Sequence, residues 1–125
     1  MEYVSVSKKP LVVPISTAEG IKEFLFRAVP FAVNEMYDTF VKKTNIASKL
    51  VKKSDLSKEE VETLEEFNTH DRLLPFRMIE ILCVANNYTY EYEFWKNHVD
   101  YADIAGIPGA AIMKDLKKKQ VRSKK

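Results

Sequence analysis

The feature that most restricts the fold is the segment from Pro75 to Asn87, which is apolar at nearly every position. Its charged exceptions are Arg77 and Glu80, three residues apart. A helix that is apolar on almost all sides is normally enclosed by other elements. Pro75 suits the first turn of such a helix, where a backbone N–H has no intrahelical partner. The segment therefore predicts a central helix around which the rest of the chain packs.

Helical spacing of apolar residues continues upstream of this segment. A wide apolar stripe runs from Ile21 to Phe40, with Thr17 placed as its N-terminal cap. Pro30 lies inside the stripe and predicts a kink or a split. Further along, Ser57 and Glu60 have the spacing of a capping box, which predicts the start of another helix.

Downstream, a helix is expected from Thr89 to Ala105, followed by Gly106 as the residue that ends it. Pro108 then predicts the start of a last helix. The packing seam of the first of these helices follows alternating steps of four and three residues: Tyr88, Tyr92, Trp95, Val99 and Ala102.

The two ends of the chain differ from its middle. Pro10 and Pro14 favour an extended arm over residues 1–16, packed on the domain or on a neighbouring subunit. Residues 114–125 carry seven lysines and arginines against one aspartate, a net charge of +6 that suits either an acidic partner or a solvated extension. We therefore expect an all-α fold: a single-domain bundle of about five helices at residues 17–118, with a basic tail at 119–125.

Composition narrows the class of protein. The chain has 125 residues, of which 46% are hydrophobic and 30% charged, typical of a globular domain. Its single cysteine, Cys83, cannot form an internal disulfide and lies among apolar residues, which predicts an inert buried thiol in a reducing compartment. Neither a secretory signal nor a membrane-spanning stretch is evident, so we expect a cytoplasmic protein. Metal-ligand spacing and a glycine-rich phosphate loop are also missing, so no metal or cofactor is expected.

Two titratable residues are candidates for acid–base chemistry. His98 lies beside the aromatic seam, where a carboxylate or water could assist proton transfer. Glu80 is the one acid of the apolar segment, and burial would raise its pKa. The alternatives are a packing role for His98 and a structural ion pair between Glu80 and Arg77.

A motif over residues 73–112 resembles the carboxymuconolactone decarboxylase and alkylhydroperoxidase D superfamily. The similar residues are Arg77-x-x-Glu80-Ile81-Leu82, then Val84-Ala85, then Tyr92-Glu93-Phe94-Trp95-x-x-His98-Val99-x-x-Ala102-x-x-Ala105-Gly106-Ile107-Pro108-x-x-x-Ile112. The resemblance implies an all-α bundle that assembles as a trimer or hexamer, with its site near a subunit interface.

The same resemblance implies a decarboxylase-like lyase acting on a small carboxylated lactone or keto acid. His98 and Glu80 match the catalytic histidine and glutamate of the family, and Tyr92, Trp95 and Arg77 would bind the substrate. Glu91 and Phe94 stand where peroxide-reducing members carry two cysteines, which excludes dithiol chemistry.

A second pattern is similar in spacing to the small matrix-facing subunit of the cytochrome bc1 complex. It consists of Val29-Pro30, Lys42-Lys43, Asp55-Leu56, Arg77, Trp95 and Asp100-Tyr101 together with the basic tail. This resemblance implies a non-catalytic accessory subunit of a larger assembly, on the matrix side of a mitochondrion.

Overall fold

The computed structural model describes residues 10–123, and it is mostly helical (66%) with a small two-stranded sheet. A short 3-10 turn at Asp71–Leu73 joins two of the helices. The expected predominance of helix is therefore confirmed, but the all-α expectation is wrong for the N-terminal region. The elements follow in the order β1 (Leu11–Thr17), β2 (Gly20–Phe26), α1 (Phe31–Val51), α2 (Lys58–Thr69), α3 (Leu74–Ala85), α4 (Tyr92–His98) and α5 (Tyr101–Ser123).

The two strands form an antiparallel hairpin in which Leu11 lies opposite Phe26 and Thr17 opposite Gly20. Thr17 was expected to cap a helix, yet its hydroxyl donates to the carbonyl of Gly20 at 2.8 Å and accepts from the N–H of Glu19 at 3.2 Å. Gly20 has a φ of 120°, which a residue with a side chain rarely adopts. A tight turn therefore replaces the predicted helix start.

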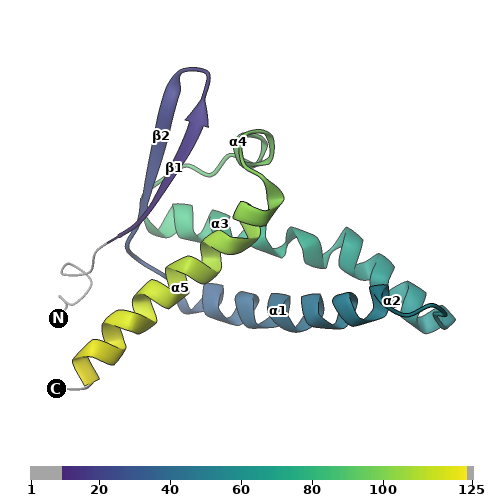
Figure 1. The fold of residues 1–125 in the computed structure, drawn as a ribbon. Coiled ribbons are helices and arrows are strands. Elements are labelled where there is room, and N and C mark those ends of the chain that lie inside the picture. The colour runs from purple at the N-terminus through teal and green to yellow at the C-terminus, as the bar shows by residue number, and fades with distance from the viewer. Residues whose placement is uncertain (1–9, 124–125) are drawn as a thin grey trace.

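One face of the hairpin is part of the core. Val13, Ile15, Phe24 and Phe26 alternate along the strands and are all buried. They pack in one cluster with four fully buried side chains of α3: Met78, Ile79, Leu82 and Cys83. Helix α3 also packs against α1 and α5, so its predicted central position is confirmed (Figure 1).

Helix α1 begins directly after Pro30. The predicted helix upstream of Pro30 is thus wrong, because residues 20–26 are strand. Of the predicted kink or split, the structure has a break, since the proline lies at the boundary of α1. Helices α1 and α2 pack on each other and extend away from the hairpin (Figure 1). Helix α2 contains no buried residue.

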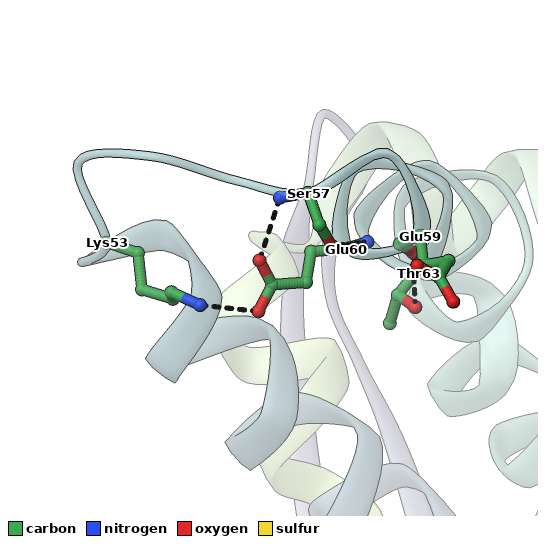
Figure 2. Close-up of polar contacts among 5 residues, drawn as sticks. All are labelled: Lys53, Ser57, Glu59, Glu60 and Thr63. Carbon is green, nitrogen blue, oxygen red and sulfur yellow. Dashed lines mark hydrogen bonds and ion pairs between the residues drawn. The ribbon is translucent and has the colours of Figure 1, made fainter.

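The predicted capping box at the start of α2 is confirmed. The Ser57 hydroxyl accepts from the N–H of Glu60 at 3.1 Å, and the Glu60 carboxylate accepts from the N–H of Ser57 at 2.9 Å. The second carboxylate oxygen of Glu60 pairs with the Lys53 ammonium at 2.6 Å (Figure 2). Nearby, the Thr63 hydroxyl donates to the carbonyl of Glu59. Because Lys53 follows α1, its ion pair joins the end of one helix to the start of the next.

The helix expected from Thr89 to Ala105 is interrupted. Helix α4 ends at His98, Val99 is extended with φ −131° and ψ 132°, and α5 starts at Tyr101. Helix α5 then continues through Gly106 and Pro108 rather than ending at the one and restarting at the other. A short helix and a long helix thus replace the predicted pair.

Helix α5 comes very close to α1 at Gly109. A Cβ atom placed on Gly109 would lie 2.6 Å from the hydroxyl of Tyr37, so any larger residue here would have to displace the Tyr37 ring. At the chain ends, residues 11–16 of the expected arm are strand β1, and the backbone of the expected tail is helical to Ser123. Residues 1–9 and 124–125 lie outside the described residues. Within the described part, no helix is both long enough and apolar enough to cross a membrane.

Candidate functional site

Trp95, expected to bind substrate, is a core residue. It is 1% exposed, and its ring centroid lies 4.7 Å from that of Phe24 and 5.9 Å from that of Phe94. Aromatic pairs at these separations contribute to packing. The indole therefore joins α4 to the inner face of the hairpin.

Tyr92 lies on the exposed side of α4. Its ring packs edge-on against Phe76 of α3 at 5.0 Å, and the Lys96 ammonium lies 5.7 Å from the ring centroid. Tyr92 and Trp95 thus pack on different elements, Tyr92 on α3 and Trp95 on β2.

His98 is the last residue of α4 and is exposed. Its imidazole packs beside Phe94 at 5.0 Å between ring centroids. The Lys22 ammonium lies 4.8 Å from the same Phe94 ring. Among the described residues, the recorded neighbour of the His98 imidazole is therefore an aromatic ring, whereas a catalytic histidine usually has a carboxylate or carbonyl that orients its ring.

Arg77 and Glu80 both lie on the exposed face of α3, together with Val84. The condition for a raised pKa, burial of Glu80, is not met, because positions 77, 80 and 84 form a strip of α3 that other elements leave uncovered. Among the described residues, no ion pair joins Glu80 to Arg77, and no hydrogen bond or ion pair joins Glu80 to His98. The structure therefore does not bring the predicted catalytic pair into contact.

Two hollows lie on opposite sides of the hairpin, and neither is lined by Glu80 or His98. The first has a volume of about 430 Å³ and lies between the end of β2 and the end of α3. It is lined by Leu25, Arg27, Ala28, Ala85, Asn86, Asn87 and Tyr88. The side chain of Asn86 is fully engaged there, since it bonds to the backbone of Arg27, Ala28 and Leu82.

The second hollow is a groove of about 290 Å³ between β1 and α5, which we call the β1–α5 groove. Five consecutive residues of β1 line one side of it, from Leu11 to Ile15. The other side is made by Val99, Asp103, Gly106, Ile107 and Ala110. Strand β1 and helix α5 thus flank an open, largely apolar groove.

The outer face of the hairpin was not predicted from the sequence, because residues 17–40 were expected to be helical. Val12 lies opposite Leu25 in the register, and the two side chains are 47% and 36% exposed. Pro14 and Ile21, the latter 71% exposed, belong to the same face. The alternation of residues 11–15 and 24–26 is the sequence signal that could have identified the hairpin and this face.

Cys83 is fully buried on α3, as predicted. Burial raises the pKa of its thiol from 9.0 to about 12, while the nearby Lys22 ammonium opposes this shift. A thiol with this pKa is protonated at neutral pH and is a poor nucleophile. Cys83 therefore acts as a small apolar core residue.

The described residues contain no group of three or more His, Cys, Asp or Glu side chains that could hold a metal ion. No protein-family model matches the chain, and comparisons with curated proteins and with solved structures found no significant match.

Proposed function

We propose that this chain is a non-catalytic accessory subunit that binds a larger protein assembly through the outer face of its hairpin. The observation that carries the proposal is the exposed apolar surface formed by Val12, Pro14, Ile21 and Leu25. Exposed apolar side chains gathered on one face of a hairpin favour a protein interface, because leaving them in water costs free energy.

The geometry of the hairpin supports this role. Its inner face is fixed to the core through Phe24, Phe26 and Trp95, so the outer face is presented on a rigid support. A rigid surface loses little conformational entropy on binding. The exposed positions are therefore better suited to docking than to packing within the chain.

The test compares two substitutions at equally exposed apolar positions. Ile21 on the hairpin and Val51 at the end of α1 are both 71% exposed. An affinity-tagged chain expressed in cells of its source should co-purify with its assembly. Ile21→Lys should lose this association, whereas Val51→Lys should retain it, with the thermal midpoint of each purified variant close to that of the parent.

The decarboxylase-like activity implied by the first resemblance remains a testable alternative. Turnover of small carboxylated lactones and keto acids by the purified chain, abolished by His98→Gln, would support that activity and contradict the accessory role. Equal co-purification by the Ile21 and Val51 variants would contradict the choice of surface.

A further inference from the structure

The outer face of the hairpin has a carboxylate at its centre. Glu23 lies between Ile21 and Leu25 at alternate positions of β2, and it is opposite Pro14 of β1. Its neighbour Phe24 is buried on the inner face, so the side chain of Glu23 points outward, where it is exposed. One acidic side chain of the two strands therefore lies among the apolar side chains on which the proposed function depends.

The hydrogen-bond pattern of the hairpin brings these side chains close together. The N–H of Leu25 donates to the hydroxyl of Tyr88 at 2.9 Å, so it points away from β1. Leu25 and Val12 are therefore a non-hydrogen-bonded pair, and the alternation of an antiparallel ladder makes Glu23 and Pro14 another. The Cα atoms of such pairs are about 4.5 Å apart, closer than those of hydrogen-bonded pairs. The Glu23 carboxylate thus has apolar neighbours on both strands.

The described residues contain no counterion for this carboxylate. No hydrogen bond or ion pair joins Glu23 to any of them. Lys22 is next to it in the sequence but turns to the inner side of the hairpin. There its ammonium lies 5.3 Å from the ring centroid of Phe24 and 4.8 Å from that of Phe94. Glu23 therefore presents an unpaired negative charge on the outer face.

Docking of the outer face would transfer this carboxylate from water into a contact lined by apolar side chains. A charge that loses its water without gaining a partner opposes binding. A cation that lies opposite the carboxylate and donates hydrogen bonds to its oxygens offsets this loss, and it fixes the orientation of the two proteins. The charge on the outer face therefore restricts what can cover it.

Two other occupants of an exposed apolar face do not meet this requirement. A second copy bound through the same face about a two-fold axis would bring an identical carboxylate to the contact, where like charges repel. A membrane surface with anionic lipids would also repel the carboxylate. A protein surface with one basic side chain among apolar ones supplies both the cation and the apolar contact.

We propose that the partner presents a lysine or arginine to the Glu23 carboxylate, within an otherwise apolar contact with the outer face of the hairpin. Glu23 then determines specificity, because it favours a partner with a basic side chain at this point over one that is wholly apolar or acidic. This inference rests on the proposed accessory function. Substitution of Ile21 tests the surface itself, whereas substitution of Glu23 tests the basic group of the partner.

The first experiment measures affinity for the protein that is captured by a photoreactive amino acid at position 21. This protein is purified and titrated against variants of the full-length chain by calorimetry. Glu23→Gln should weaken binding by about 30-fold or more, because it leaves the cation of the partner without a counterion. Glu23→Lys should abolish binding. The matched control is Glu62→Lys, the same charge change at an exposed position of α2, which should bind as the parent does.

The same titration includes Ile21→Lys, which separates two kinds of failure. Parent-like affinity of Glu23→Gln and Glu23→Lys, with loss of binding by Ile21→Lys, would overturn this inference and leave the proposed function intact. Parent-like affinity of Ile21→Lys would contradict the surface of the proposed function, and the inference would fall with it.

A charge exchange tests the basic residue of the partner directly. Each lysine and arginine in the cross-linked segment of the partner is changed to glutamate in turn. One of these changes should weaken binding to the parent chain and restore binding to Glu23→Lys, because the ion pair forms again with its charges reversed. Failure of every such change to restore binding would overturn the inference.

The other two occupants are tested with the purified chain alone. Sedimentation velocity measures self-association, and flotation with vesicles of equal parts phosphatidylcholine and phosphatidylserine measures membrane binding. Each assay compares the parent with Ile21→Ser, which removes apolar surface from the outer face without adding charge. We expect the two proteins to behave alike in both assays. A dimer or vesicle binding that Ile21→Ser removes would assign the outer face to that occupant and overturn the inference.

Discussion

The side-chain amide of Asn86 forms two hydrogen bonds with the backbone of Ala28, accepting from its N–H at 2.9 Å and donating to its carbonyl at 3.0 Å. Asn86 follows the last residue of α3, and Ala28 lies just beyond β2. Two further bonds reach the N–H of Arg27 at 2.7 Å and the carbonyl of Leu82 at 2.7 Å. One side chain therefore fixes the hairpin to the central helix.

Asn86→Ala should lower the free energy of unfolding by about 2 kcal/mol, because it leaves several partly buried backbone groups without partners. Chemical denaturation measures this loss. Asn45→Ala, at an exposed position of α1, is the control and should change stability by less than about 0.5 kcal/mol. Equal effects of the two substitutions would show that Asn86 does not hold the hairpin.

Alanine at two glycines of α5 should have opposite effects. Gly106→Ala meets open space and should stabilise the helix by about 0.5–1 kcal/mol. Gly109→Ala places its methyl group 2.6 Å from the Tyr37 hydroxyl and should destabilise the fold by about 1–3 kcal/mol. Thermal unfolding of the two variants measures the difference. An equal gain at both positions would contradict the close approach of α1 and α5.

The capping box of α2 predicts a dependence of stability on acid. The hydrogen bond from Lys53, with further bonds from Ser57, lowers the pKa of Glu60 below its ordinary value of 4.5. A carboxyl group with a lowered folded-state pKa contributes stability above 4.5 and loses it as the pH falls through the folded-state pKa. The stability difference between the parent and Glu60→Gln should therefore be present at pH 7 and shrink below pH 4.5. A difference that is constant with pH would exclude this contribution.

Burial of Cys83 predicts a loss of stability at high pH. Desolvation raises the pKa of the thiol to about 12, whereas an unfolded chain has its ordinary value of 9.0. A group with a raised folded-state pKa contributes stability below 9.0 and loses it as the pH rises from there toward about 12. The parent should lose more stability than Cys83→Ala between pH 8 and pH 10.5, as measured by urea denaturation. Parallel pH profiles would contradict burial of the thiol.

The features that sequence predicted correctly depend on local chemistry or on dense apolar sequence. Ser57 and Glu60 satisfy each other within one turn, so their spacing alone identifies the cap. The central position of α3 and the burial of Cys83 follow from the apolar run that contains them. These predictions needed no knowledge of distant contacts.

The hairpin was missed because its apolar residues fit two periods. Ile21, Phe24 and Leu25 match helical spacing, whereas Phe24 and Phe26 match the alternation of a strand. The contact between Phe24 and Trp95 favours the strand, because in a strand Phe24 and the next-but-one residue, Phe26, both face the core in which Trp95 is buried. That contact joins residues far apart in the chain, and no local pattern contains it.

The candidate site was predicted less well, for a related reason. Sequence placed Glu80 in an apolar helix but could not determine which strip of α3 would remain uncovered. Similarly, the break at Val99 separates α4 from α5 and leaves His98 exposed at a helix end. Burial of a single polar residue depends on the arrangement of neighbouring elements, which periodicity does not specify.

The most direct test of the proposed accessory role is photo-cross-linking from the outer face of the hairpin. A photoreactive amino acid replaces Ile21 in one sample and Val51 in another, and each chain is irradiated in cells of its source. We predict a discrete cross-linked partner of the assembly from position 21, and no such product from position 51. Products of equal yield from both positions, or none from position 21, would contradict the account.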